Sequence, residues 1–241
     1  MSLINKVKNP YVLLVLATLF WGSNFPLGSL LVQTLPPVQL SFLRWLVAFV
    51  IFAPFMYRKV KEHRAIIAHR WKFLLLLSIT SIVGFNTCLY IGVQYTSPIN
   101  ASLINSISPL LIVFMSVICL HEKMGKTHYF GLVLSTCGVI WILSEGSITN
   151  LISFSFNRGD LFVILAVLCW SSYSVLLRIW GDSLTKDVTL VVTIGFGLVC
   201  LLPAALIEYM GYAFDYSQLT GSMWLLVIYL GIFPSIISFI C

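Results

Sequence analysis

Charged residues are scarce in this chain of 241 residues: Asp, Glu, Lys and Arg make up 9% of it, against about a quarter of a typical soluble domain. Hydrophobic residues make up 59%, more apolar surface than a soluble fold of this size can keep from water. The composition therefore excludes an ordinary soluble protein and predicts a polytopic membrane protein. Its net charge of +6 does not indicate a nucleic-acid partner, because the basic residues lie between apolar runs.

Residue patterns that carry catalysis, metals or redox chemistry are also missing from the apolar runs. They contain no paired Asp, no Ser with His and no His-Glu-x-x-His. The six cysteines form no Cys-x-x-Cys pair, and the four histidines lie in or beside basic loops at no metal-ligand spacing. We therefore expect no intramembrane enzyme, no metal site and no cofactor. Nothing resembles a selectivity-filter loop or a ring of charges, which argues against a channel.

Eight apolar runs are long enough to cross about 30 Å of hydrocarbon, so we predict an all-α integral membrane protein. These runs are Tyr11–Val32, Val38–Tyr57, Phe73–Val93, Ala101–Leu120, His128–Ser144, Leu161–Trp180, Val188–Met210 and Met223–Cys241. Twelve Lys and Arg residues lie before the first run or in alternate loops after it, and only Arg158 lies in the other loops. Basic loops stay in the cytoplasm, so the amino terminus is predicted to be cytoplasmic.

The first and sixth runs repeat each other at an offset of 149 residues. The residues that recur unchanged are Leu16, Ala17, Leu19, Trp21, Ser23 and Leu27, which return as Leu165, Ala166, Leu168, Trp170, Ser172 and Leu176. The same offset carries Pro54 onto Pro203, which indicates two homologous halves. Because five spans separate the starts of the halves, the second copy is inverted in the membrane. Inverted repeats are a transporter architecture, with the substrate path at their interface.

Motifs along the chain resemble the EamA-like branch of the drug/metabolite transporter superfamily. They are Trp21-Gly22-Ser23-Asn24-Phe25, Phe42-Leu43-Arg44, Asn100-Ala101-Ser102-Leu103, Ser108-Pro109-Leu110 and Leu120-His121-Glu122-Lys123. The resemblance implies ten spans in two inverted five-span repeats, and export or exchange of amino acids and related metabolites.

On that pattern, residues 1–144 form the first repeat and 145–160 an external linker. Residues 161–241 form a second repeat cut short after three spans, so that eight of ten expected spans are present. An offset of 153 aligns Trp224 with Trp71 and Ile232 with Ile79, which places the end of the sequence inside the eighth span. We therefore expect the full protein to continue for two more spans.

Polar and aromatic residues inside the spans are the candidates for substrate binding, because such groups are costly in a bilayer. The set is Trp21, Asn24, Arg44, Asn86, Tyr90, Asn105, Ser106, Trp170 and Tyr173. Asn24, Arg44, Asn86, Asn105 and Ser106 are predicted to share the outer half of the membrane, which suits a pocket for a small polar solute. The alternative is that these residues only hydrogen-bond neighbouring helices. The tryptophans and Tyr173 either line the path or pack the helices.

Arg44 is the sharpest feature, because a guanidinium about 5 Å from the midplane costs at least about 2.5 kcal/mol unless it is paired. No Asp or Glu lies at matching depth in the eight spans. A transported carboxylate is one candidate partner. The others are outward snorkelling of Arg44, rim carboxylates and backbone carbonyls.

The leading hypothesis is a secondary transporter in a bacterial plasma membrane that exports or exchanges amino acids or related zwitterions and anions. The alternative is efflux of hydrophobic cationic compounds, which favours a buried carboxylate that the spans do not offer. The expected partners are a small-molecule substrate and the lipid bilayer. The coupling ion, a role of Glu208 in coupling, and the oligomeric state stay open.

Overall fold

The computed structural model describes residues 10–121, 125–143, 157–180, 183–212 and 215–240, and every regular element in them is helical. The prediction of an all-α protein is therefore confirmed for these residues. Among the described residues, six helices are long and apolar enough to cross a membrane: Pro10–Leu31, Pro37–Glu62, Trp71–Tyr95, Pro98–Leu120, Arg158–Trp180 and Lys186–Gly211. The other two predicted spans coincide with shorter apolar helices, Tyr129–Gly138 and Gly221–Ile237. Residues 145–156 of the predicted linker lie outside the described residues.

The helices follow the chain as a series of apolar segments. They are α2 (Pro10–Leu31), α3 (Pro37–Glu62), α4 (Arg64–His69), α5 (Trp71–Ser78), α6 (Asn86–Tyr95), α7 (Pro98–Asn105), α8 (Ser108–Leu120), α9 (Lys126–Leu143), α11 (Arg158–Trp180), α12 (Lys186–Tyr212), η2 (Tyr216–Gln218), α13 (Gly221–Ile232) and α14 (Ser238–Ile240). Several starts have a local cause: Pro37 and Pro98 lie in the first helical turn, where a missing N–H costs nothing. The Ser97 side chain caps α7 by accepting from the Asn100 backbone N–H.

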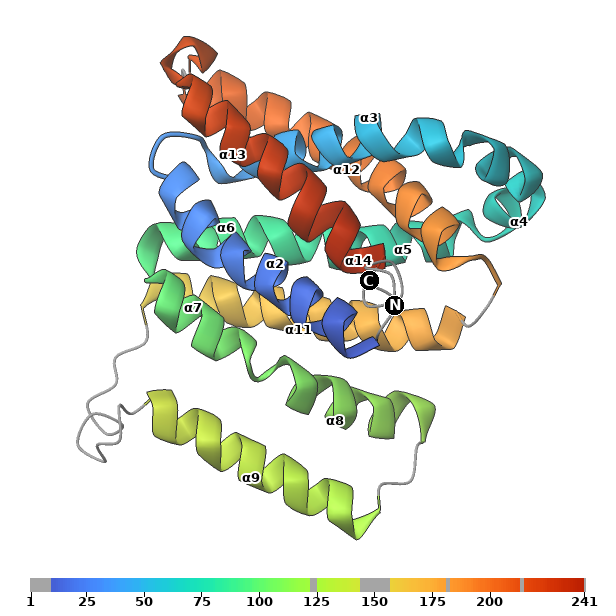
Figure 1. The fold of residues 1–241 in the computed structure, drawn as a ribbon, viewed down its shortest axis with the longest axis vertical. Coiled ribbons are helices and arrows are strands. Elements are labelled where there is room, and N and C mark those ends of the chain that lie inside the picture. The colour runs from blue at the N-terminus through green and yellow to red at the C-terminus, as the bar shows by residue number, and fades with distance from the viewer. Residues whose placement is uncertain (1–9, 122–124, 144–156, 181–182, 213–214, 241) are drawn as a thin grey trace, which may run out of the picture.

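Helix α3 packs along α12 and α13, and α6 packs along α11 (Figure 1). Helix α2 crosses α6 and α7 near the middle of the bundle, while α9 lies at its edge. Large apolar side chains of α9 are exposed, among them Phe130 at 70% and Trp141 at 62%. Such a surface belongs in lipid rather than in water.

Glycine permits the closest approach between α6 and α11. A Cβ on Gly159 would lie 2.5 Å from the Gly92 carbonyl oxygen and 2.7 Å from the Thr96 backbone nitrogen. The start of α11 is also held by a capping box, in which Asp160 accepts from the Asn157 N–H and Asn157 Oδ1 accepts from the Asp160 N–H. Thr96 Oγ1 donates to Asp160 Oδ1 over 2.6 Å, which ties this cap to the end of α6.

Two π-helical segments interrupt otherwise α-helical spans. The first, η1 (Ile79–Phe85), lies between α5 and α6, and the second, η3 (Phe233–Ile237), lies between α13 and α14. The offset of 153 residues carries 79–85 onto 232–238, so the two segments fall at nearly the same register of the repeat. Short π-segments inside helices are frequent at functional sites.

A carboxylate of α12 caps the start of α3. Glu208 Oε1 and Oε2 accept from the backbone N–H groups of Val38 and Gln39 at 3.2 and 2.8 Å. These donors have no partner within α3, and the positive end of the helix dipole favours a negative charge there. Beside them, burial together with Tyr209 and Glu208 raises the pKa of the Tyr216 hydroxyl, which donates to Gln39 Oε1. The role of Glu208 that the structure displays is to hold α3 against α12.

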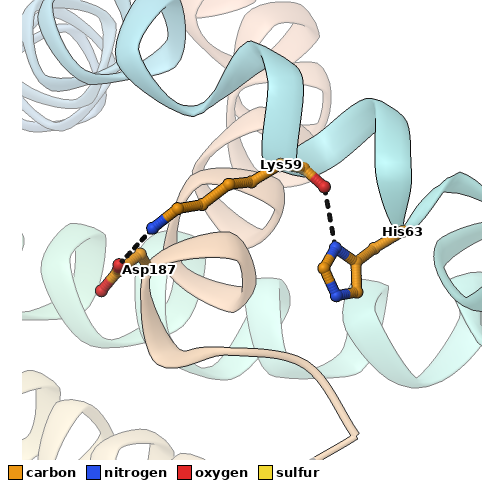
Figure 2. Close-up of polar contacts among 3 residues, drawn as sticks. All are labelled: Lys59, His63 and Asp187. Carbon is orange, nitrogen blue, oxygen red and sulfur yellow. Dashed lines mark hydrogen bonds and ion pairs between the residues drawn. The ribbon is translucent and has the colours of Figure 1, made fainter.

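The opposite ends of α3 and α12 are joined by an ion pair, Lys59 Nζ to Asp187 Oδ2 at 3.3 Å (Figure 2). Its two side chains are 49% and 39% exposed, so solvent screens the pair and it contributes about 0–1 kcal/mol. His63 Nδ1 lies 2.8 Å from the Lys59 carbonyl oxygen, where α3 ends. The two helices are thus tied at both ends, strongly by Glu208 and weakly by Lys59.

Candidate functional site

Arg44 is buried at 2% exposure and is held by four neutral side chains. Its Nη1 donates to Asn24 Oδ1 and Asn86 Oδ1, each at 2.8 Å, and to the Tyr90 hydroxyl at 2.7 Å. Its Nε donates to Ser235 Oγ at 2.7 Å. Tyr90 in turn donates to Asn24 Oδ1 at 2.9 Å, which joins the residues into one network. These dipoles stabilise the guanidinium without neutralising its charge.

Each π-helical segment orients one of these partners. Asn86 follows η1, and its amide nitrogen donates to the Ser81 carbonyl five residues earlier, at 2.9 Å. Ser235 lies in η3, and its hydroxyl donates to the Leu230 carbonyl five residues earlier, at 2.8 Å. Because those donors are occupied, the Asn86 Oδ1 and Ser235 Oγ lone pairs face Arg44. The irregular turns thereby fix the acceptor side of the network.

A cavity of about 90 Å³ adjoins the network, which is room for about three water molecules at their liquid volume of about 30 Å³ each. It lies among α2, α3, η1, α6, α7, α11 and α14. Its lining residues are Trp21, Asn24, Phe25, Arg44, Trp45, Phe85, Asn86, Asn105, Trp170 and Phe239.

One wall of the cavity is aromatic. The Trp170 ring lies 5.8 Å from Trp21, 5.0 Å from Phe85 and 5.9 Å from Phe239, centroid to centroid. Trp21 and Trp170 are the matching residues of the sequence repeat, and their rings meet edge to face. The polar wall (Asn24, Arg44, Asn86 and Asn105) comes from the first half of the chain, so the cavity has one polar and one aromatic side.

Hydrogen-bond donors remain available on the polar side. Arg44 Nη2 and Asn24 Nδ2 form no hydrogen bond with any described residue, although both side chains line the cavity. The Trp45 indole N–H is buried and lacks a partner among the described residues, and the Arg44 guanidinium carbon lies 5.1 Å above the Trp45 ring. Within the described part of the chain no carboxylate lies within 4 Å of Arg44. The cavity therefore offers a positive charge and free donors, a combination that suits an anionic group.

Seven of the nine residues that the sequence proposes gather here. Asn24, Arg44, Asn86 and Tyr90 share the hydrogen-bond network, and Trp21, Asn105 and Trp170 line the cavity.

The other two proposed residues lie elsewhere. Ser106 is exposed and donates to the Leu103 carbonyl at 2.6 Å, because α7 ends at Asn105 and the chain turns there. Tyr173 touches the Trp170 ring at 5.4 Å but is buried in a different apolar cluster, with Leu74 and Trp180.

The sequence did not single out Ser235, Trp45 or Phe239. Pro234 indicates a helix irregularity next to Ser235. The sequence does not distinguish a serine that also contacts a buried arginine from one that bonds only its own helix backbone. Phe239 occupies the position of Asn86 in the offset of 153, so the repeat itself points to this residue.

The apolar helices and the partly polar cavity between them define a multi-pass membrane protein with an internal cavity. Residues 8–144 match the EamA-like transporter family, and the chain belongs to this family of membrane transporters.

The relatives of the chain are transporters as well. The uncharacterized transporter YetK of Bacillus subtilis (strain 168) is 30% identical over 237 residues, which cover 98% of this chain and 71% of YetK. The uncharacterized transporter YyaM of the same organism is 26% identical over 235 residues, covering 98% of this chain and 76% of YyaM. A protein crystal structure shares the fold with a TM-score of 0.63 and 22% identity, over 95% of this chain and 75% of that one.

Proposed function

We propose that this transporter exports or exchanges a small amino acid, or a related zwitterionic or anionic metabolite, and binds its carboxylate at Arg44. The observation that carries the proposal is a buried guanidinium beside a cavity, whose partners among the described residues are all neutral and whose Nη2 bonds none of those residues. A carboxylate in the cavity can accept from Nη2 and from Asn24 Nδ2, as an anion held by charge-assisted hydrogen bonds.

The rest of such a substrate has a matching surface. The aromatic wall offers ring faces to an ammonium group through cation–π attraction, and apolar contact to a short side chain. A volume of about 90 Å³ suits a molecule the size of alanine better than a bulky aromatic compound.

Replacing Arg44 with glutamine is the direct test. We expect the affinity for an anionic or zwitterionic substrate to fall about 10- to 100-fold, the equivalent of one charge-assisted interaction of about 1.5–3 kcal/mol. Arg44→Lys should restore only part of it, because an ammonium lacks the planar fork. The measurement is uptake and export of a panel of labelled amino acids and organic anions by vesicles that contain the protein.

Arg158→Gln is the matched control, because it removes an exposed cation at the start of α11 and should leave transport unchanged. Thermal unfolding of each variant separates binding from folding. Wild-type affinity in Arg44→Gln would contradict the binding role, and so would a variant that fails to fold under conditions where the wild type is stable.

The proposed mechanism is alternating access by two inverted halves, residues 1–144 and 161–241, joined by the linker 145–160. In this proposal the chain contributes eight spans, of which the fifth and the eighth are the two shorter apolar helices. Two observations support this proposal. The repeat-related Trp21 and Trp170 are in contact at the cavity, and η1 and η3 fall at nearly the same register of the repeat. Exchange between two states requires α3 and α12 to separate at one end at a time, where Glu208 and Lys59 now join them.

The proposed orientation in the bacterial plasma membrane places the amino terminus and the basic segment 57–71 in the cytoplasm, with 146–159 outside. We expect Lys61→Cys to resist an impermeant thiol reagent in intact cells and to react in inverted vesicles. Arg158→Cys should behave in the opposite way. This orientation is proposed because Lys and Arg are concentrated in alternate loops, and basic loops stay in the cytoplasm. Labelling of Lys61→Cys in intact cells would contradict the proposed orientation and indicate the opposite one.

Efflux of a hydrophobic cation is the second candidate, and the aromatic wall is the observation that favours it. Arg44 opposes it, because a cation in the cavity would meet an unneutralised positive charge. Including a lipophilic quaternary ammonium compound in the transport panel distinguishes the two: its transport should improve, not fail, in Arg44→Gln.

A further inference from the structure

A second hollow, of about 480 Å³, lies between α3 and α12 on the outside of the bundle. Its volume falls within the range of about 300–1,000 Å³ that is typical of ligand sites. The side chains along it are apolar, with Phe49, Ala53 and Val60 on α3 facing Val192 and Val199 on α12. Val199 is 70% exposed, so the groove opens to the surroundings of the helix bundle rather than to the substrate cavity.

The length of the groove matches one leaflet of a bilayer. Phe49 lies at the middle of the 26-residue helix α3, and Val60 lies near its end. Eleven residues of helix at 1.5 Å per residue span about 16 Å, close to half of the roughly 30 Å hydrocarbon core. Tyr57, 66% exposed, lines the groove near the end of α3, the level at which aromatic rings meet the headgroups. An acyl chain laid in the groove would run from the membrane surface to the midplane.

The surface end of the groove is basic. Ile67 of the short helix α4 closes the groove, and the Lys59–Asp187 ion pair bridges α3 and α12 at the same end (Figure 2). Lys61 follows the lining residue Val60 on α3, and Arg64 lies three residues before the lining residue Ile67 on α4. The acidic Glu62 lies between them in the sequence, so basic residues outnumber acidic ones here. The Lys61 and Arg64 side chains are exposed, and neither forms a hydrogen bond or an ion pair with another described residue.

We propose that this groove is a binding site for an anionic phospholipid, with one acyl chain between α3 and α12 and the phosphate on Lys61 and Arg64. The groove is apolar along its length and has basic side chains at one end. An anionic phospholipid has the matching parts, an apolar acyl chain and a negatively charged phosphate. The site is separate from the Arg44 cavity and does not depend on the proposed substrate. A lipid wedged between α3 and α12 would also add to the contacts that hold these two helices together.

The test uses the purified full chain in detergent, with phosphatidylglycerol and phosphatidylcholine of identical acyl chains as probes. Native mass spectrometry measures retained lipid, and the thermal unfolding midpoint measures stabilisation. We expect phosphatidylglycerol to be retained more strongly and to raise the midpoint further than phosphatidylcholine. Lys61→Gln/Arg64→Gln should reduce that preference by about fivefold for each basic side chain removed.

The groove itself is tested by Ala53→Phe, which fills its centre and should lower retention of both lipids. Val50→Phe is the matched control, because Val50 lies on the same helix, is 62% exposed and is outside the groove. Equal retention of the two lipids by the wild type, or equal behaviour of the two phenylalanine variants, would overturn the proposal. So would an equal rise in midpoint with glycerol 3-phosphate alone. A dimer that Ala53→Phe dissociates would instead assign the groove to a second copy of the chain.

Discussion

Gly28→Ala is expected to weaken substrate binding about tenfold or more and to lower the unfolding midpoint, although it adds a single methyl group. A Cβ at Gly28 would lie 2.7 Å from Tyr90 Cε1 and 3.1 Å from Cδ1. The ring is fully buried, and its hydroxyl is bonded to Arg44 and Asn24, so it cannot move aside without breaking these contacts. Overpacking of this kind costs about 1–3 kcal/mol, and here the displaced group is part of the site.

Gly22→Ala is the control on the same helix, since nothing lies within 4 Å of a Cβ there. It should stabilise the protein slightly, by about 0.5–1 kcal/mol, because alanine favours helix over glycine. A double-mutant cycle sharpens the test: in a Tyr90→Leu background, most of the effect of Gly28→Ala should vanish. If Gly28→Ala and Gly22→Ala behave alike in transport and unfolding, the ring contact has no role in the site.

Gly159→Ala is expected to be the most destabilising methyl addition in the described chain. Its Cβ would collide with two backbone atoms, the Gly92 carbonyl oxygen at 2.5 Å and the Thr96 nitrogen at 2.7 Å. Backbone atoms cannot rotate away as a side chain can, so the end of α6 and the start of α11 must separate. We expect a loss near the upper end of the about 1–3 kcal/mol typical of overpacking, read as a lower midpoint in detergent.

Gly211→Ala provides the comparison, because that Cβ would meet nothing within 4 Å. The two substitutions add the same atoms to helices, yet should shift the midpoint in opposite directions. A Gly159→Ala protein as stable as the wild type would mean that α6 and α11 are not packed as closely as described.

The helical fold follows from the sequence because apolar length is a strong signal. Within the described residues, six of the eight predicted spans coincide with helices long and apolar enough to cross a membrane, and the other two coincide with shorter apolar helices. The breaks inside the spans are only partly predictable, because Pro234 marks the position of η3 whereas η1 contains no proline. The π-segments η1 and η3 depend on the partners that accept their irregular hydrogen bonds, and those partners come from tertiary packing rather than from local composition.

Depth in the membrane explains why the polar site could be anticipated. Asn24, Arg44 and Asn86 lie on different helices, and equal depth on neighbouring spans was enough to predict their proximity. The same reasoning puts Ser106 at the depth of Asn105, but Ser106 is not among the residues that line the cavity. One continuous helix is assumed there, whereas α7 ends at Asn105 and α8 begins at Ser108. It missed Ser235 because facing Arg44 requires the η3 turn to aim the hydroxyl.

The π-segment η1 makes the site depend on chain length as well as on side chains. A wide turn holds an extra residue, and each residue of an α-helix advances the next side chain by about 100°. Asn86 and Tyr90 follow η1, so their direction toward Arg44 is set by that extra residue upstream. Point substitutions at Asn86 or Tyr90 change the chemistry of these side chains. A one-residue deletion in 79–85 would keep their chemistry but turn both side chains away from Arg44. The hydrogen-bond network around Arg44 therefore depends on the number of residues in η1 as well as on their side chains.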